Sequence, residues 1–284
     1  MGLLEGKVVL VTGGARGQGR AHAVVSAREG ADVIVVDIDE QIGSVHYPTA
    51  RQDDLNETVR QVEELDRRVL AVTADVRSQE QLDAAVAQGI EEFGGIDILI
   101  ANAGIWTLGQ FWELTDEQWQ DTIDVNLTGV WRSAKAVAQH MIERQTGSIV
   151  ITSSINGLEG GANYAHYTAS KHGLVGLMRT IALELAPYGI RCNTIHPGAV
   201  NTPMHHHQRT YDMFAGHPGG TYEDMIEGGY HYGALKGTTF MPPEAMAHAA
   251  LFLNSHLASN VTGVTLPVDA GHLLLTGANA SPVK

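Results

Sequence analysis

The apolar residues of the chain fall into two recurring patterns. Between longer segments, short runs rich in valine and isoleucine lie at residues 7–12, 32–37, 69–74, 97–101, 148–153 and 190–195. Runs that are apolar throughout are typical of strands buried on both faces of a sheet. In the intervening segments the apolar residues recur at a helical spacing, as in Leu174, Leu177, Ile181 and Leu185. This alternation predicts an α/β fold, with a doubly wound parallel sheet in a single domain over residues 1–284.

Two segments interrupt the alternation. Asp39–Asp54 is polar and rich in turn-forming residues, and Val200–Phe240 is rich in Gly, His, Met and Tyr. Irregular segments of this length in a compact domain usually bind ligands or cover a site. Both follow the carboxyl ends of predicted strands, where open α/β sheets bind their ligands. We therefore expect an insertion at 39–54 and a substrate lid at about 200–240.

The composition narrows the class of protein without changing this fold. Of the 284 residues, 44% are hydrophobic, which is enough for a large core. No apolar run has the roughly 18–20 residues that a membrane-spanning helix needs, and Met1–Lys7 lacks the layout of a signal peptide. We therefore expect a soluble cytoplasmic protein. Cys192 is the single cysteine, which excludes an intrachain disulfide and suits a reducing compartment. The formal net charge of −14 opposes binding to nucleic acid.

The first predicted strand runs into a glycine-rich turn, Thr12–Gly19 (TGGARGQG). Gly13, Gly17 and Gly19 permit a tight turn and let the backbone approach a pyrophosphate, while the following helix offers amide donors. An ordinary glycine turn has the same composition. The strand before it, the helix after it and the acid at the end of the next strand favour a dinucleotide site of the Rossmann type, with Arg16 and Gln18 in the loop.

The acid at the end of the second predicted strand is Asp37. A carboxylate there accepts hydrogen bonds from the adenosine ribose of NAD and repels the extra phosphate of NADP. Arg16 complicates this prediction, since a basic residue in the glycine loop is able to pair with that phosphate, unless it points to solvent. Asp37 should occupy the position that the phosphate needs, so we predict NAD as the cofactor.

Tyr167 and Lys171 stand four residues apart in the sequence YTASK, and Ser154 follows the fifth predicted strand. In a helix, residues four apart share one face, so the phenol and the ammonium would be neighbours. The spacing alone is weak, because surface helices carry Tyr and Lys at this distance by chance.

Taken together, TGGARGQG, Ala101–Gly104 (ANAG), Asn126, Ser154 and YTASK resemble the classical short-chain dehydrogenase/reductase family over nearly the whole chain. The resemblance implies that Tyr167 is the general acid/base and that Ser154 positions the substrate oxygen. It implies that Lys171 and the oxidised nicotinamide favour the phenolate, that Lys171 holds the nicotinamide ribose, and that Asn126 carries a water-mediated proton relay to Lys171.

The same resemblance assigns further residues to the cofactor and to the assembly. The implied cofactor contacts lie after the successive strands, at Ile38, Asp75, Val76, Asn102, Ala103, Gly104, Pro197, Gly198, Val200 and Thr202. Pure structural support is the alternative for Asn102. Leu266–Gly271 matches the last strand of the family, which lies near a subunit contact, so the resemblance implies a homotetramer.

The insertion, together with ARGQGRAHA and VDID, resembles the mycofactocin-associated subgroup, which includes carveol dehydrogenases. This resemblance implies that Asp39–Asp54 folds over the adenosine end of NAD, that NAD is retained, and that a redox peptide accepts the electrons. A solvent loop tolerated by the fold is the alternative.

The expected substrate pocket combines aromatic, aliphatic and methionine side chains. Its predicted lining, beside Ser154, is Trp106, Ile155, Tyr164, Met204, Met213 and Phe214. Methionine adapts to irregular apolar shapes, which favours a cyclic or terpenoid secondary alcohol and its ketone, although ordinary packing of the lid is the alternative. His205, His206 and His207 are interpreted as lid surface, and no metal site is expected.

Two other functions stay open from the sequence. A non-catalytic NAD-binding redox sensor would keep the fold, but all four residues of the predicted catalytic set are present. A ketoacyl or sugar reductase of the same fold would usually favour NADP, which Asp37 opposes.

Overall fold

The computed structural model describes residues 2–284 and contains one parallel sheet of seven strands in the order β3-β2-β1-β4-β5-β6-β7. The strands are β1 (Val8–Thr12), β2 (Asp32–Asp37), β3 (Val69–Thr73), β4 (Ile98–Ala101), β5 (Gly147–Thr152), β6 (Ile190–Pro197) and β7 (Thr265–Val268). The six strands predicted from the apolar runs are present to within two residues at either end, and β7 ends three residues before the predicted end at Gly271. The order reverses between β1 and β4, which is where a doubly wound sheet opens a crevice for ligands.

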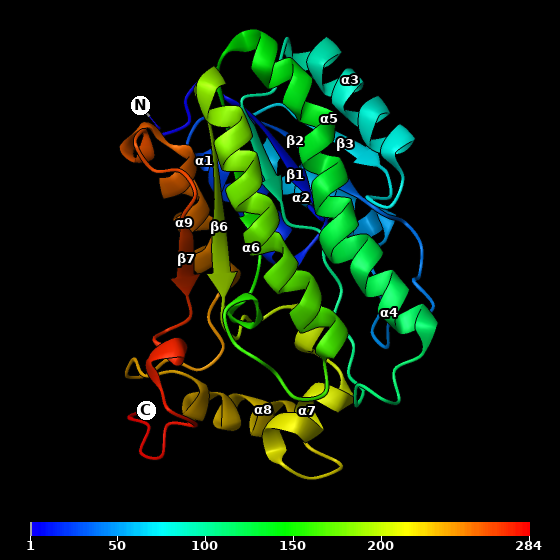
Figure 1. Ribbon diagram of the computed structural model, residues 1–284, viewed down its shortest axis with the longest axis vertical. Coiled ribbons are helices and arrows are strands. Elements are labelled where there is room, and N and C mark those ends of the chain that lie inside the picture. Colours follow the sequence, from blue (N-terminus) through cyan, green and yellow to red (C-terminus); the bar gives the residue numbers. More distant parts are fainter. Residues whose placement is uncertain (1) are drawn as a thin grey trace.

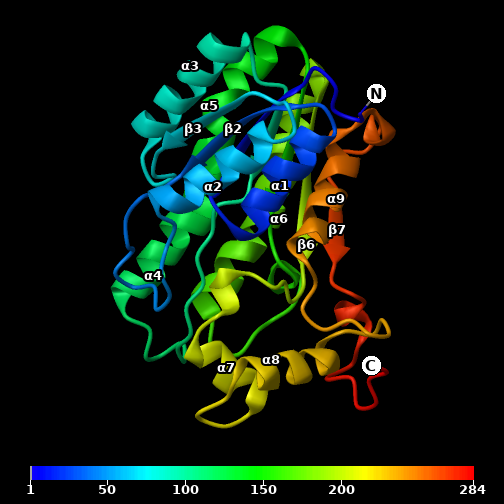
Figure 2. The ribbon, with the colours of Figure 1, turned by 180° about the vertical axis from the view of Figure 1, so that it is seen from behind.

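Helices cover both faces of the sheet (Figures 1 and 2). One face carries α1 (Gly17–Arg28), α2 (Gln52–Glu63) and α9 (Pro243–Asn254). The other carries α3 (Gln79–Phe93), α5 (Gly129–Arg144) and α6 (Ala165–Leu185), with α4 (Asp116–Ile123) joined to α5 by the π-helical turn η1 (Asp124–Thr128). The fold is therefore the predicted doubly wound α/β fold.

The core consists of one apolar layer on each side of the sheet. All five residues of β1 are buried, because the strand lies in the middle of the sheet with helices above and below. On α6 the predicted apolar face is buried at Leu174, Ile181 and Leu185, and Leu177 is partly buried. Burial of this face fixes the rotation of α6 and hence the direction of its other side chains.

The predicted lid is more regular than its composition indicated. It contains α7 (Gln208–Ala215) and α8 (Tyr222–Gly229), which lie beyond the carboxyl edge of the sheet together with the C-terminal segment (Figure 1). Short 3₁₀ turns complete the chain at Ile155–Gly157, Ala186–Tyr188, Pro203–His205, Tyr230–Tyr232, His256–Ala258 and His272–Leu274.

The insertion also differs from its expected bounds. Its irregular part ends at Arg51, because residues 52–54 already form the first turn of α2.

None of the helices within residues 2–284 has the length and apolar character that crossing a membrane requires.

Candidate active site

The glycine loop between β1 and α1 can accommodate a dinucleotide phosphate. A Cβ on Gly19 would lie 1.8 Å from the carbonyl oxygen of Gly13, and a Cβ on Gly13 would lie 2.7 Å from Cα of Ala103. Gly17, with φ of +54°, starts α1, and within residues 2–284 no side chain caps this helix end. Its amide groups therefore remain available to an anion, as helix amino-termini in such loops do.

Asp37 lies at the carboxyl end of β2 beside this loop. Its Oδ2 accepts a hydrogen bond from the Ala15 amide at 2.9 Å, and its Oδ1 accepts one from the Ile38 amide at 2.9 Å. Burial raises the pKa of the Asp37 carboxyl, while these two hydrogen bonds oppose the increase. The carboxyl group thus ties the glycine loop to the second strand and also lines the pocket.

The Arg16 side chain is half-buried and lines the pocket, so it does not point to solvent. Its guanidinium donates a hydrogen bond to the carbonyl of Pro48 in the insertion. The guanidinium that would pair with the extra phosphate of NADP is thereby hydrogen-bonded to the protein backbone.

Three of the four residues of the predicted catalytic set, Ser154, Tyr167 and Lys171, come from the segment after β5 and from α6. Lys171 is 3% exposed, and its Nζ donates to the carbonyl of Thr152 at 2.9 Å and lies 5.5 Å from the centre of the Tyr167 ring. Ser154 lies two residues after the end of β5, and its Oγ accepts a hydrogen bond from the Asn156 amide at 3.2 Å. The three side chains line one pocket, so the structure brings together the predicted phenol, ammonium and hydroxyl.

The ionisation of these groups is set mainly by burial. Burial raises the pKa of Tyr167 to about 12, and hydrogen bonding to Ser154 opposes that increase. Burial also lowers the pKa of Lys171 to about 7. The lowered pKa expected for Tyr167 is therefore not produced by Lys171 within the protein alone.

Asn126, for which the family resemblance implies a proton relay to Lys171, lies behind the pocket wall. It lies in the π-helical turn, is fully buried and does not line the pocket. Its Oδ1 accepts from the Ile105 amide at 2.8 Å and its Nδ2 donates to the Ile105 carbonyl at 2.9 Å. The side chain holds the segment after β4, and a proton relay through it stays a prediction.

Nearly all the other predicted cofactor residues line the same pocket, including Asn102, Ala103 and Gly104 after β4. The Asn102 Nδ2 donates to the carbonyls of Thr12 and Gly13 at 3.2 Å each, so this residue does support the glycine loop. The further predicted residues on the pocket wall are Gln18, Ile38, Asp75, Val76, Pro197, Gly198 and Thr202.

Val200 is the exception among these residues. It is 1% exposed, packs in the core and pairs with Met241 in an isolated parallel bridge. The Val200 side chain therefore does not line the pocket, and a contact of this residue with the cofactor stays a prediction.

The insertion is packed against the body of the protein and is not a solvent loop. Ile42, Val45 and Tyr47 are buried in one apolar cluster with Val76 and Ile105. The residues of the insertion that line the pocket are Ile42, Tyr47, Thr49 and Ala50, none of which the sequence identified individually. The insertion thus forms part of the pocket wall.

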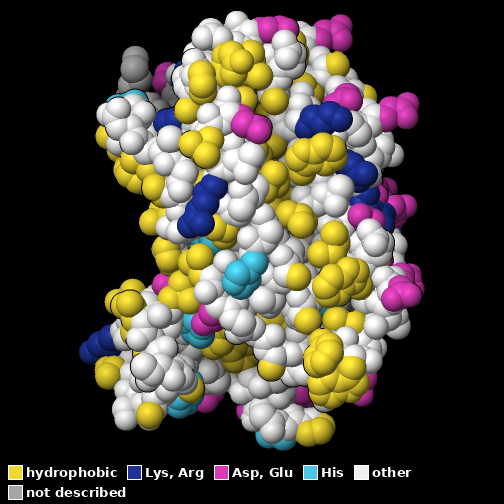
Figure 3. Space-filling model, viewed as in Figure 1, with side chains coloured by type: hydrophobic (Ala, Val, Ile, Leu, Met, Phe, Trp, Pro, Cys, Tyr) yellow, Lys and Arg dark blue, Asp and Glu magenta, His cyan; other side chains and the backbone are white. Residues whose placement is uncertain are grey.

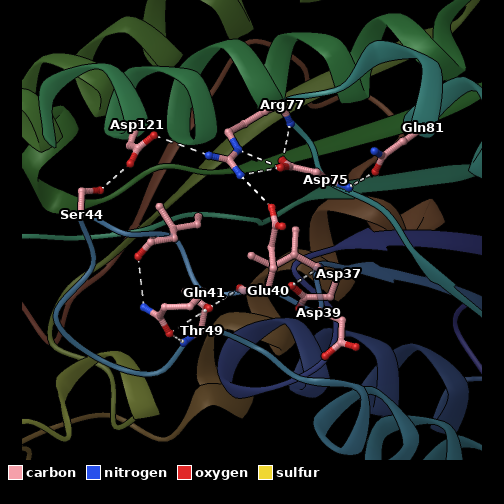
Figure 4. Close-up of polar contacts among 12 residues, drawn as sticks. Asp37, Asp39, Glu40, Gln41, Ser44, Thr49, Asp75, Arg77, Gln81 and Asp121 are labelled. Carbon is pink, nitrogen blue, oxygen red and sulfur yellow. Dashed lines mark hydrogen bonds and ion pairs between the residues drawn. The ribbon is translucent and has the colours of Figure 1, made fainter. Parts of the chain in front are cut away.

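Arg77 links the insertion to the rest of the molecule (Figure 4). Its guanidinium contacts Asp75 at 2.7 Å, Glu40 at 3.1 Å and Asp121 at 3.5 Å. Ser44 donates to the second oxygen of Asp121 at 2.6 Å. One cation therefore joins the first part of the insertion to the segment after β3 and to α4, and the carboxylate of Asp75 is engaged in this network.

The predicted substrate residues all line the pocket near Ser154 and Tyr167. They are Trp106, Ile155, Tyr164, Met204, Met213 and Phe214. The pocket also has polar walls that sequence reasoning missed, at Asn156 and Tyr232. Asn156 is 7% exposed and its Nδ2 has no hydrogen-bond partner among the described residues. No local motif marks either residue.

The assignment of all three lid histidines to the surface is wrong for two of them. His205 lines the pocket, with its ring centre 5.4 Å from that of Trp106, and His207 stacks on Tyr47 at 5.5 Å. His206 is exposed as expected. Within residues 2–284, no group of His, Cys, Asp and Glu side chains is arranged to hold a metal ion.

The sequence of the chain is similar to those of known oxidoreductases. Residues 7–212 match the family described as short chain dehydrogenase. The chain is 45% identical to an uncharacterised NAD-dependent oxidoreductase of Mycobacterium tuberculosis, covering 96% of this chain and 98% of that one. It is 44% identical to (-)-trans-carveol dehydrogenase of Rhodococcus erythropolis, covering 96% and 100%.

A solved structure agrees over nearly the whole length as well. The crystal structure of carveol dehydrogenase from Mycobacterium avium in complex with NAD superposes with a TM-score of 0.94 at 41% identity, covering 97% of this chain and 100% of that one.

Proposed function

The chain belongs to the short chain dehydrogenase family, and we propose that it is an NAD-dependent oxidoreductase that interconverts a secondary alcohol and its ketone. The observation that carries this proposal is the convergence of Ser154, Tyr167 and Lys171 on the pocket that begins at the uncapped glycine loop. The relatives named as NAD-dependent enzymes and as carveol dehydrogenases support it.

In the proposed reaction the chain holds the alcohol and removes its hydroxyl proton. Ser154 hydrogen-bonds the substrate oxygen and places it beside Tyr167, whose phenolate takes the hydroxyl proton and becomes the neutral phenol. Lys171, buried under the Tyr167 ring, supplies an ammonium that favours the phenolate when it is charged. NAD, when bound, accepts the hydride and adds a positive charge that favours the phenolate further.

The pocket residues support an apolar substrate, and we propose a cyclic or terpenoid secondary alcohol such as carveol. Trp106, Ile155 and Phe214 supply flat and branched apolar surface, while Met204 and Met213 adapt to its shape. A screen of cyclic, linear and hydroxylated secondary alcohols with NAD tests the function. Activity restricted to sugars or acyl-carrier substrates would contradict it.

The charge of Asp37 is expected to select NAD over NADP. Asp37→Asn keeps an acceptor for the Ala15 amide but removes the negative charge. We expect the ratio of kcat/KM for NAD to that for NADP to fall at least about tenfold, since 1.4 kcal/mol of lost repulsion corresponds to that factor. A wild-type protein that favours NADP would contradict the assignment.

We further propose that the insertion retains NAD, so that a redox peptide such as mycofactocin, and not free exchange, carries away the electrons. The burial of Ile42, Val45 and Tyr47 and the contacts of Arg77 support a closed insertion. Purified protein that contains NAD(H) and reduces an artificial electron acceptor would agree with retention, whereas protein that exchanges NAD freely would not.

Arg77 gives a direct test of this retention. In Arg77→Met the carboxylates of Asp75, Glu40 and Asp121 lose their shared cation and repel one another. We expect NADH to dissociate about tenfold faster in a stopped-flow chase. Arg68→Met is the matched control, because Arg68 pairs with Asp32 at the amino-terminal end of β2 and leaves the insertion intact.

The family resemblance also supports a homotetramer in the cytoplasm as a proposal. Large apolar side chains are exposed on α5 and α6, at Trp131 (44%) and Leu183 (77%). Figure 3 shows apolar side chains on the face of the molecule that α5 and α6 cover. Light scattering on the purified protein measures the assembly.

A further inference from the structure

The insertion reaches beyond the adenosine end of the pocket to its substrate end, through Tyr47. This side chain is 4% exposed and lines the pocket. Its hydroxyl accepts a hydrogen bond from the Trp106 amide at 3.1 Å, across 59 residues of sequence. Its ring stacks on His207 of the lid, with centres 5.5 Å apart and planes within 16°.

The segment after β4 has two successive amides that are held by side chains from elsewhere. Asn126 accepts from the Ile105 amide, and Tyr47 accepts from the Trp106 amide. Both amides are buried, and the folded protein is destabilised when a buried amide loses its hydrogen-bond acceptor. The backbone position of Trp106 therefore depends on the insertion as that of Ile105 depends on the turn between α4 and α5.

Trp106 in turn organises the wall of the substrate pocket. Its ring lies 6.1 Å from Tyr164, 5.4 Å from His205 and 6.0 Å from His207. A shift of the Trp106 backbone would move the indole against all three rings. Tyr47 of the insertion therefore contacts both the substrate wall, at Trp106, and the lid, at His207.

Tyr47 is itself held in place from within the insertion. The Gln41 Nε2 donates to the carbonyls of Ile42, Val45 and Tyr47 at 3.1–3.2 Å, and its Oε1 accepts from the Thr49 amide at 3.1 Å. The turn around Tyr47 is therefore tied at several points, and its ring is buried beside Val76 and Ile105. A side chain fixed in this way can support a neighbouring backbone.

We propose that Tyr47 is a positioning residue that sets the shape of the substrate pocket, with its hydroxyl fixing Trp106 and its ring supporting His207. The insertion therefore determines which alcohols fit, in addition to covering the adenosine end. A cyclic alcohol that fills the space beside Trp106 depends on this support, whereas a small alcohol such as 2-propanol does not. This inference rests on the proposed function for its substrate.

Tyr47→Phe isolates the hydroxyl, because the ring, its burial and its stack on His207 remain. We expect KM for a cyclic secondary alcohol to rise about tenfold, with KM for 2-propanol, kcat and the Kd for NADH each unchanged within about twofold. His207→Ala removes the stack while leaving the Trp106 hydrogen bond, and should raise the same KM. Tyr188→Phe, at an exposed site far from the pocket, is the matched control.

Amide hydrogen exchange tests the contact without any turnover. The peptide that contains Trp106 should exchange faster in Tyr47→Phe than in the wild type or in Tyr188→Phe. Unchanged exchange at Trp106 together with an unchanged KM would overturn the proposal, as would a weakened affinity for NADH that accounts for the whole loss. A wild type that oxidises no alcohol would contradict the proposed function, and the exchange experiment would still decide whether Tyr47 positions Trp106.

Discussion

Tyr167→Phe is expected to lower kcat for alcohol oxidation by about 10²–10⁴-fold, the range typical of a lost general base. Phenylalanine keeps the ring over the Lys171 ammonium but has no oxygen to take the proton. Because burial raises the pKa of Tyr167 to about 12, the phenol is protonated at neutral pH in the protein alone. The wild-type rate of oxidation should therefore rise with pH, and the variant should lose that dependence.

Binding of NADH separates this chemical effect from a structural one. The glycine loop and Asp37 lie at the other end of the pocket, so the Kd for NADH measured by fluorescence should change by less than about threefold. A Tyr167→Phe protein that turns over alcohol at a near-normal rate would refute the assignment of the base.

Much of the fold was predictable because it depends on local pattern. The strands at 32–37 and 98–101 are short apolar runs whose two faces are both covered, and such runs have few other stable placements. The glycine loop was predictable for a related reason. Gly13 and Gly19 stand where a Cβ would collide with backbone atoms, so the residue type itself carries the information.

The catalytic residues were predictable only in combination. Tyr167 and Lys171 share a face of α6 by their spacing, but that spacing says nothing about where the face points. The direction is set by burial of Leu174, Ile181 and Leu185 on α6. The sequence contains this apolar stripe, and the resemblance to a family supplied the partner Ser154, which lies in the segment after β5.

The features that sequence reasoning missed depend on how irregular segments fold back. Tyr47 meets Trp106 across 59 residues, and Arg77 meets Asp121 across 44. His205 and His207 turn inward although His206 between them is exposed. No periodicity governs such loops, because each side chain is placed by a tertiary contact instead of by the repeat of a helix or strand.

Lys171→Met is expected to abolish turnover and at the same time to stabilise the fold. Activity should fall at least about 10²-fold, because the ammonium that favours the phenolate is lost. The stability gain follows from burial: the Lys171 side chain is 3% exposed, and Thr152 is its one hydrogen-bond acceptor within residues 2–284. The pKa of Lys171 is about 7 in the folded protein, against 10.5 for an ordinary lysine. At and below about pH 7, keeping this ammonium buried therefore lowers the free energy of unfolding by about 5 kcal/mol.

The pH dependence of this gain identifies its cause. Between about pH 7 and 10.5 the unfolded chain binds the proton that the folded protein has released, so wild-type stability rises with pH through this window. The advantage of Lys171→Met should thus be greatest at and below about pH 7 and should vanish near pH 10.5. Since methionine leaves the Thr152 carbonyl without its donor, we expect a net gain of about 1–4 kcal/mol, measured as a higher Tm by calorimetry at several pH values. Equal Tm values for the two proteins at pH 7, or a difference that grows toward pH 10, would show that the buried ammonium does not oppose folding.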